Sequence, residues 1–373
     1  MKTPTTLFGQ LTAEQFLAEY WQKKPLLVRG AVPDIGQILD RDELFALAAD
    51  EGMESRFVSQ AGGWQMRHGP FSQRELKRAP KPWTVLVQSV NLASARAEQL
   101  MRRFDFIPYA RLDDLMVSYA TDGGGVGPHF DNYDVFLIQG MGSRRWRIGK
   151  QKDQTLIDGL PVRILKNFKP SRDWVLQPGD MLYLPPEWAH DGIAGGECMT
   201  FSVGFRAFPA QELAEQFLCF LQDHLRLPGR YRDPDLRLQK HPAEIGQAMI
   251  EQVDTLLSSV RWNRGNVRDF LGVTLTEPKP HVFFDPPAQP LSLSRFTATA
   301  KRRGILLDQR SLLLFAGKHF YLNGELWPVS VVDVPALRQL ADQRTLRSPN
   351  FLQPETFSAL HAAYKAGFIG LSA

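Results

Sequence analysis

The sequence is poor in cysteine, lacks long apolar runs and carries little net charge. Its two cysteines are Cys198 and Cys219, and neither has a second cysteine at the spacing of a metal site. These features exclude a zinc finger and a disulfide framework, and they fit a reducing compartment. No apolar stretch approaches the roughly 20 residues that span a bilayer, and residues 1–10 lack the basic and apolar segments of a secretory signal. We therefore expect a soluble, cytoplasmic protein without membrane contact.

The charges are almost balanced. The 44 lysines and arginines exceed the 40 acidic residues by a formal net charge of +4, in a chain of 373 residues. So small an excess permits an acidic or nucleic-acid-rich partner, but it is usually just an ordinary solvated surface. We expect no direct nucleic-acid binding. The length is sufficient for two or three domains of about 100–200 residues each.

The first 207 residues combine two helices with many short strands. Thr12 and Gln15 form a capping-box pattern for a first helix, and a second is expected over residues 41–49. Residues 140–143, Gly-Met-Gly-Ser, predict a tight hairpin between two strands. The expected strands cover residues 24–30, 83–90, 115–120, 133–139, 144–148, 180–184 and 199–205. Many short strands between glycine and proline turns are typical of a β-sandwich or barrel.

The pattern becomes helical near residue 209. Helices expected over residues 211–225 and 243–260 carry apolar faces that must be buried against something. A second copy of the chain is the simplest partner, because helix pairs commonly form two-fold interfaces. Packing on the barrel or on the C-terminal part is the alternative.

The C-terminal part follows a proline-rich linker over residues 278–290. Asn323-Gly324 is a strong hairpin signal, and helices are expected over residues 334–342 and 354–366. This combination suggests a winged-helix shape, which serves either DNA binding or protein docking. The chain thus divides into residues 1–208, 209–277 and 278–373.

Three residues have the pattern of a metal site. His129 and Asp131 are two positions apart, so on a strand both side chains leave the same face. His190 follows a later apolar strand and could supply a third ligand. Two histidines and one carboxylate form the facial triad of non-heme iron(II) oxygenases, which leaves coordination positions open for chemistry. His-x-Asp alone is weak, since it also arises in surface turns, but the glycine run before it and the Pro-Gly-Asp, strand, Pro-Pro, His string after it make the combination specific.

At these residues the sequence resembles the JmjC-type 2-oxoglutarate oxygenases, and most closely the bacterial ribosomal oxygenases. The matching strings cover residues 113–118, 123–134, 139–146, 177–186 and 202–206. The resemblance implies a mixed α+β fold: a double-stranded β-helix (cupin/JmjC) barrel, a helical dimerisation region and a winged-helix-like domain. It also implies a homodimer that uses Fe(II) and O2, converts 2-oxoglutarate to succinate, and hydroxylates Cβ of an arginine in a large-subunit ribosomal protein of the L16 type.

A 2-oxoglutarate oxygenase needs a cation in the barrel for the distal carboxylate of its cosubstrate. Arg144 fits, because a guanidinium can hold a carboxylate through two hydrogen bonds; a solvated hairpin arginine is the alternative. Arg145 and Arg147 should face outward. Ser118 and Thr200 could add hydroxyl donors to the same pocket.

A cationic substrate needs a carboxylate and an apolar wall near the metal. Asp114, Met116 and Ser118 alternate onto one strand face. We hypothesise that Asp114 pairs with the substrate guanidinium, while Tyr133 and Met116 flank its stem and Ser202 completes the wall. A simple cap at the start of the strand is the alternative role for Asp114.

Other functions share parts of this pattern. A JmjC-type lysine demethylase, or another protein hydroxylase, would have the same triad and fold. A non-catalytic cupin binding module would not require an intact triad, and a metal-dependent isomerase would have no obvious task for Arg144.

Overall fold

The computed structural model describes residues 7–347 and 349–372. Part of the segment expected to lack a secretory signal, residues 1–6, lies outside this description. The chain divides into two compact units. One comprises Met1–Ala207 with Lys279–Asp285 and Asp308–Arg310, and the other comprises Phe208–Pro278, Pro286–Leu307 and Ser311–Ala373. No helix among the described residues is both long and apolar enough to cross a membrane.

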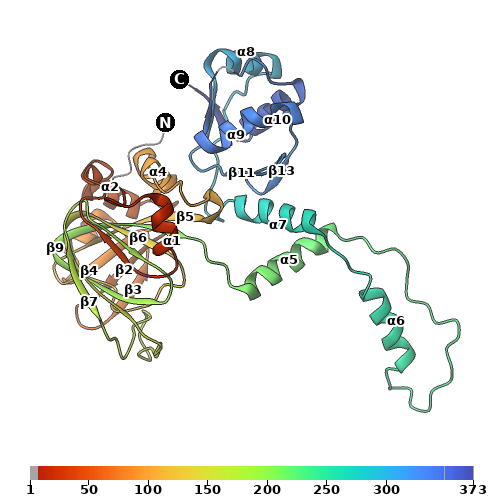
Figure 1. The fold of residues 1–373 in the computed structure, drawn as a ribbon, viewed down its shortest axis with the longest axis horizontal. Helices are drawn as coiled ribbons and strands as arrows, with labels where there is room; N and C mark the ends of the chain where they lie inside the picture. Colours follow the sequence, from red (N-terminus) through yellow and green to blue (C-terminus); the bar gives the residue numbers. More distant parts are fainter. Residues whose placement is uncertain (1–6, 348, 373) are drawn as a thin grey trace. The chain divides into compact units, whose positions relative to one another are not determined.

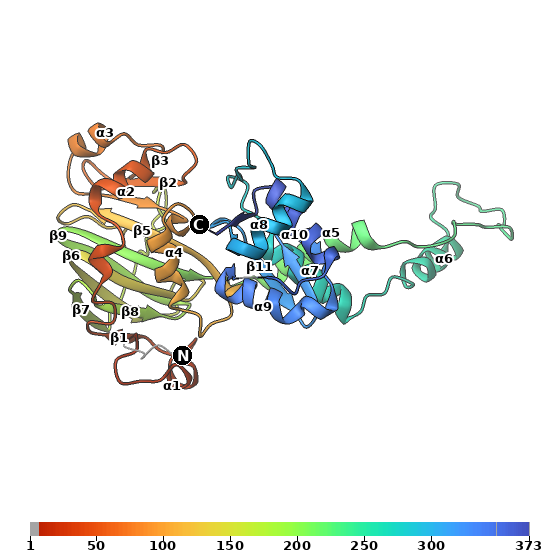
Figure 2. The ribbon, with the colours of Figure 1, turned by 90° about the horizontal axis from the view of Figure 1, so that it is seen from above.

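In the first unit, the described residues form one nine-stranded antiparallel sheet (Figures 1 and 2). Its order is β1-β8-β6-β9-β5-β4-β2-β3, with β7 paired to β6. The strands are β1 (Leu26–Val28), β2 (Ser55–Ser59), β3 (Gln65–His68), β4 (Trp83–Val87), β5 (Leu112–Ala120), β6 (Val135–Lys150), β7 (Arg172–Leu176), β8 (Met181–Leu184) and β9 (Trp188–Phe205).

Short helices accompany this sheet. They are α1 (Ala13–Glu19), η1 (Ile35–Gln37), α2 (Arg41–Ala48), α3 (Gln73–Arg78), η2 (Val90–Leu92), α4 (Ala95–Arg102) and η3 (Tyr109–Arg111). The predicted capping box is confirmed: the hydroxyl of Thr12 accepts from the N–H of Gln15, whose side chain accepts from the N–H of Thr12. A cap of this kind satisfies backbone donors that no helical carbonyl can reach.

The two faces of the sheet have different chemistry. On β5, Leu115 and Val117 belong to the main hydrophobic core, which also contains Phe16 of α1 and Phe45 of α2. The residues between them face the other way, because side chains alternate along a strand. One cross-strand row on that second face consists of buried polar residues, namely Ser118 on β5, Thr200 on β9 and Gln139 on β6. The second face of the sheet is therefore polar along this row.

The predicted hairpin at residues 140–143 is wrong. β6 runs without a turn from Val135 to Lys150 and pairs with β9 on both sides of the glycines, with register shifts between Gln139 and Ser143. Gly142 has a φ of 59°, and a Cβ there would lie 2.0 Å from the carbonyl oxygen of Glu197 on β9. The glycines therefore permit a bulge and a close approach of two backbones. A local reading of the sequence could not distinguish this bulge from a turn.

In the second unit, helices are separated by small sheets. The helices are α5 (Ala210–His224), α6 (Gln247–Leu257), α7 (Arg264–Thr276), α8 (Leu293–Arg303), η4 (Val331–Asp333), α9 (Val334–Gln343) and α10 (Pro354–Lys365). Two three-stranded sheets of the described residues have the orders β14-β10-β15 and β11-β12-β13. Their strands are β10 (Ile305–Leu307), β11 (Leu313–Ala316), β12 (His319–Leu322), β13 (Glu325–Trp327), β14 (Thr345–Leu346) and β15 (Ile369–Leu371). The sequence did not predict α7 or α8.

The predicted hairpin at Asn323-Gly324 is confirmed. Leu322 pairs with Glu325 across a two-residue loop in which both residues have positive φ, 48° at Asn323 and 90° at Gly324. Such a turn follows the right-handed twist of the strands that it joins. A hydrophobic core that includes Phe296, Phe320, Leu337 and Leu360 lies between these strands and α8, α9 and α10.

Candidate metal centre

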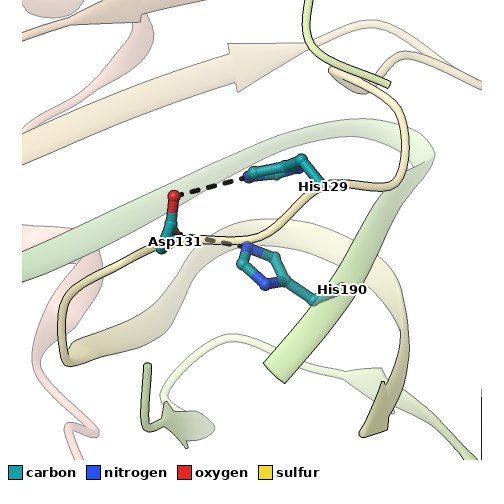
Figure 3. A group of neighbouring side chains, drawn as sticks. All are labelled: His129, Asp131 and His190. Carbon is teal, nitrogen blue, oxygen red and sulfur yellow. Dashed lines mark ion pairs between the residues drawn. The ribbon is translucent and has the colours of Figure 1, made fainter. Parts of the chain in front are cut away.

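His129, Asp131 and His190 come together in the first unit (Figure 3). His190 lies near the start of β9, whereas His129 and Asp131 lie in the connection between β5 and β6. The expectation that this pair lies on a regular strand is wrong, since β6 begins only at Val135. His129 is nevertheless extended, because its N–H and carbonyl exchange hydrogen bonds of 3.0 and 2.9 Å with those of His190. This isolated bridge fixes the two histidines to each other.

The three side chains converge on one point. One ligand atom of each lies within 4.8 Å of the others. Nε2 of His129 is 3.9 Å from Oδ1 of Asp131, and Nε2 of His190 is 3.5 Å from Oδ2 (Figure 3). These separations leave room for an ion bound by two imidazole nitrogens and one carboxylate oxygen, with its remaining positions open.

Backbone carbonyls orient both imidazoles. Nδ1 of His129 lies 2.9 Å from the carbonyl oxygen of Gly127, and Nδ1 of His190 lies 2.9 Å from that of Trp188. A carbonyl only accepts, so each Nδ1 carries a proton, and the coordinating lone pair of the neutral ring is on Nε2. Hydrogen bonds of this kind fix the tautomer of metal-binding histidines.

The electrostatics suit a cation. Burial and the neighbouring His190 lower the pKa of His129, which keeps that ring neutral. Burial alone would raise the pKa of Asp131, but the hydrogen bond and charge of His190, with the other nearby groups, lower it to about 2. Burial alone would lower the pKa of His190, yet Asp131 outweighs it and raises that pKa. The protein thus stabilises positive charge beside Asp131, and a bound divalent cation would supply that charge.

Arg144 is a buried cation on the interior face of β6. Its Nη1 lies 3.5 Å from Oγ of Ser118, and its guanidinium lies 5.7 Å from the ring centre of Trp146. Within the described part of the chain, its Nε and Nη2 are buried without a hydrogen-bond partner. Buried donors without partners are costly, so this site fits an anionic ligand such as a carboxylate.

The residues around Arg144 differ in whether their polar groups are still free to bind a ligand. The hydroxyl of Thr200 donates to Oε1 of Gln139 at 3.2 Å, so its proton is already used within the row of polar residues. Arg145 forms an exposed ion pair with Asp173. Arg147 pairs with the buried Asp191, and both Arg145 and Arg147 lie on the face opposite to Arg144, as the alternation along a strand requires.

The four predicted substrate residues also lie on this side of the sheet. Met116 is the cross-strand neighbour of Ser202. Asp114 is buried, and a Cβ added to Gly204 would lie 3.7 Å from Oδ1 of Asp114 and 3.9 Å from Cε2 of Tyr133. Tyr133 is half-exposed and hydrogen-bonds Asp131. Tyr133 therefore lies beside the metal triad, and Asp114 lies in the neighbourhood of Tyr133.

Sequence reasoning missed residues that support the site. Trp146 lies 5.9 Å, between ring centres, from His190. Asp134 is fully buried and accepts from the hydroxyl of Tyr183 at 2.6 Å and from Nε2 of Gln22 at 2.9 Å, which anchors the end of the metal-binding connection. Asp134 stands in the same string as the triad, but nothing local shows that its partners come from distant segments.

The fold and the site define a JmjC-type oxygenase domain followed by a winged helix. Residues 99–213 match the JmjC domain family, and residues 259–369 match the ROXA-like winged helix family. An X-ray structure of E. coli ycfD has a TM-score of 0.85 at 31% identity and covers 97% of this chain and 99% of its own. A structure of the same protein with cobalt and 2-oxoglutarate has a TM-score of 0.83 at 31% identity and covers 98% of this chain and 99% of its own.

Two curated relatives indicate which kind of JmjC-type oxygenase this chain is similar to. The ribosomal protein uL16 3-hydroxylase of Escherichia coli K12 is 33% identical over 354 residues, which is 93% of this chain and 94% of that protein. A probable ribosomal oxygenase of Haemophilus influenzae is 38% identical over 248 residues, 65% of this chain and 59% of that protein. The chain belongs to the ribosomal oxygenase family. The expected JmjC barrel and winged-helix-like domain are confirmed.

Proposed function

We propose that the protein is an Fe(II)- and 2-oxoglutarate-dependent oxygenase that hydroxylates Cβ of an arginine in the large-subunit ribosomal protein uL16. The observation that carries this proposal is the pair formed by the open His-Asp-His triad and the buried, incompletely bonded guanidinium of Arg144. The triad suits the metal, and the guanidinium suits the cosubstrate. The arginine substrate comes from the likeness to the E. coli uL16 3-hydroxylase.

In this proposal His129, Asp131 and His190 hold the iron. The Nδ1 hydrogen bonds of the two histidines keep both imidazole lone pairs directed at it. Bound iron with 2-oxoglutarate supplies the O2 activation and C–H cleavage, with release of succinate and carbon dioxide. Arg144 holds the distal carboxylate of 2-oxoglutarate, with Ser118 beside it. Thr200 contributes by fixing Gln139, since its own proton is already donated there.

Substrate recognition is assigned to residues further along β5 and β9 from the polar row, and to Tyr133. Asp114 pairs with the substrate guanidinium, Tyr133 and Met116 flank its aliphatic stem, and Ser202 completes the wall beside Met116. These residues act by holding the target carbon near the metal, because C–H chemistry demands close and reproducible placement of the reacting atoms.

The wider assignments are also proposals. Three functional regions are proposed, at residues 1–208, 209–277 and 278–373, with a homodimer formed through the middle one. Exposed apolar side chains on α5 and α6, including Leu218, Ile250 and Leu257, support this interface. A cytoplasmic location follows from a ribosomal substrate. A lysine demethylase is less well supported, because the NO66 relative of Drosophila persimilis, a lysine-specific demethylase and histidyl-hydroxylase, matches only 24% of this chain.

The proposal is tested by measuring the turnover of 2-oxoglutarate by the purified protein in the presence of purified ribosomal proteins. We expect Fe(II)-dependent conversion of 2-oxoglutarate to succinate, and mass spectrometry should find one added oxygen atom on an arginine of uL16. Both signals should be absent in His129→Ala. Succinate formation without a modified arginine would reject the substrate but keep the oxygenase. No turnover and no bound metal would favour a non-catalytic binding module.

A further inference from the structure

Two carboxylates stand side by side on β5, and the chain supplies its own cation to both. Lys279 places Nζ 3.4 Å from Oδ1 of Asp113 and 4.0 Å from Oδ2 of Asp114. The same Nζ lies 3.3 Å from Oγ of Ser89. Although Lys279 follows α7 in the sequence, it belongs to the same compact unit as the sheet. A distant part of the chain thus reaches the proposed substrate residue.

Ser89 holds the same carboxylate oxygen. Its backbone N–H donates to Oδ2 of Asp114 at 2.8 Å, and its hydroxyl lies 3.3 Å from that oxygen. Ser89 has a φ of 54°, in the left-handed region that serine rarely adopts. A backbone kept in that region by its surroundings often belongs to a functional site. Oδ2 of Asp114 is therefore committed to Ser89 and Lys279.

The other oxygen of Asp114 lies near Gly204. Oδ1 lies beside Gly204 and the ring of Tyr133, whose hydroxyl hydrogen-bonds the metal-triad residue Asp131. Gly204 keeps this side open, since a Cβ there would contact both Oδ1 and the tyrosine ring. One oxygen is thus anchored by Ser89 and Lys279, while the other lies on the side of Gly204 and Tyr133.

We propose that Lys279 is a positioning residue for substrate recognition: with Ser89 it holds Oδ2 of Asp114, so that Oδ1 remains a charged acceptor for the substrate guanidinium. This inference rests on the proposed function, because it concerns recognition of the same arginine. Lys279 acts through Asp114 and does not touch the substrate.

The charge of Lys279 matters because Asp114 is buried. Burial raises the pKa of Asp114, the charge of Lys279 opposes that rise, and the charge of Asp113 adds to it. A protonated carboxyl offers no negative charge to a guanidinium, so a group that favours the ionised form strengthens substrate binding. Arg206 also acts on both carboxylates, and Tyr133 near Asp114 is itself influenced by Asp131 and Arg56.

Arg206 is a second cation near both carboxylates, and its closest contact is with Asp113. Its Nε lies 3.8 Å from Oδ1 of Asp113, so Asp113 keeps a neighbouring cation when Lys279 is replaced. Asp114 would retain the hydrogen bonds of Ser89 but lose the nearest lysine charge. Replacement of Lys279 should therefore act mainly on the ionisation and placement of Asp114.

The first experiment measures steady-state kinetics of the full-length protein with a uL16 peptide that contains the target arginine. Lys279→Gln should raise the KM for the peptide about tenfold near neutral pH, because Asp114 would lose the nearby positive charge that favours its ionised form. The increase should fall mostly on KM and should shrink as the pH rises, because Asp114 then ionises without the help of Lys279. Lys279→Arg keeps the charge and should bring KM back to within about twofold of wild type.

Two control variants separate this role from a structural one. Lys77→Gln removes an exposed lysine from α3 and should leave the peptide KM unchanged. Asp113→Asn breaks the closest ion pair of Lys279 but removes a negative neighbour of Asp114. If Lys279 only tethered the chain, Asp113→Asn would raise KM as much as Lys279→Gln does, and that result would overturn the proposal.

The second experiment does not depend on turnover. Carbon-13 NMR of labelled aspartate carboxyls, with Asp114 assigned by the loss of its signal in Asp114→Asn, follows the ionisation of Asp114 directly. Its titration midpoint should lie at higher pH in Lys279→Gln than in wild type. Equal midpoints would overturn the proposal. A wild-type protein that leaves the peptide unmodified would instead contradict the proposed function, and the midpoints would still decide the effect of Lys279 on Asp114.

Discussion

At the scale of single residues, the buried guanidinium of Arg144 destabilises the ligand-free protein but suits a bound carboxylate. Its buried Nε and Nη2 have no hydrogen-bond partner among the described residues. Arg144→Met should therefore raise the KM for 2-oxoglutarate about 100-fold, because a charge-assisted, two-point hydrogen bond is lost. The melting temperature without ligand should stay the same or rise, since an unpaired buried charge is removed.

Arg145→Met is the matched control for Arg144→Met. Arg145 is exposed and paired with Asp173, and exposed ion pairs contribute about 0–1 kcal/mol. This variant should leave the KM for 2-oxoglutarate within about twofold of wild type. A 2-oxoglutarate KM that is equal in Arg144→Met and wild type would show that the cosubstrate is held elsewhere.

A second residue-scale prediction concerns Asp180, whose carboxylate accepts three hydrogen bonds and joins its own segment to Arg29 and Gly30. It is buried and accepts from the N–H of Gln177 at 2.8 Å, from the N–H of Gly30 at 3.0 Å and from Nη1 of Arg29 at 2.6 Å. Asp180→Ala should lower the free energy of unfolding at neutral pH by about 2–4 kcal/mol, measured by urea denaturation, because several charge-assisted hydrogen bonds are lost. The exposed Asp158→Ala should change it by less than about 0.5 kcal/mol.

The free energy of unfolding that is lost in Asp180→Ala should depend on pH in a defined direction. Burial alone would raise the pKa of Asp180, but its hydrogen bonds and Arg29 together lower it below the ordinary value of 3.8. A carboxyl with a lowered folded pKa stabilises the protein fully above its unfolded pKa, and this contribution is lost as the pH falls through the folded value. The stability difference between wild type and Asp180→Ala should hence shrink below about pH 4. A difference that is constant down to pH 3, roughly one unit lower, would exclude this ionic contribution.

At the scale of elements, the sequence predicted what local chemistry determines. The capping box of α1 and the Asn323-Gly324 hairpin depend on residues within three or four positions, and both are present. The convergence of His190 with His129 was also predictable, because the ligand types and their flanking strings limit the choice. The bulge in β6 was not, since it depends on how β6 meets β9. Contacts such as Lys279 with Asp114 were missed for the same reason, as their partners are far apart in the sequence.

The bulge of β6 gives an element-scale prediction. Gly142→Ala should destabilise the protein by about 3 kcal/mol or more, because the added Cβ would combine a left-handed backbone with a severe clash. The clash is with the carbonyl oxygen of Glu197, 2.0 Å from the Cβ position. Gly196→Ala is the control, since Gly196 also has a positive φ, of 80°, but no atom lies within 4 Å of its Cβ position. That variant should lose only about 1–2 kcal/mol. Equal losses in thermal unfolding would mean that the close approach of the two strands has no energetic role.

At the scale of the whole molecule, α5 and α6 carry large apolar side chains that are exposed to solvent in a single copy of the chain. Leu218 on α5 is 63% exposed, and Ile250 and Leu257 on α6 are 49% and 62% exposed. No residue of α6 is buried, although the whole helix lies within the described residues. Each side chain of this size that leaves water contributes about 1.5–3 kcal/mol, so a second copy that covered these faces would be strongly favoured.

We therefore predict that the protein is a dimer at micromolar concentration and that Ile250→Asp and Leu257→Asp, combined, shift it to monomer. A charge buried in an apolar interface costs several kcal/mol, so the dimer should weaken by about 100-fold or more. Sedimentation equilibrium measures this shift directly. Val332→Asp is the control, because Val332 is 73% exposed but lies outside α5 and α6, and its variant should remain dimeric. A wild-type protein that sediments as a monomer would contradict the interface, and a double variant that stays dimeric would place it on another surface.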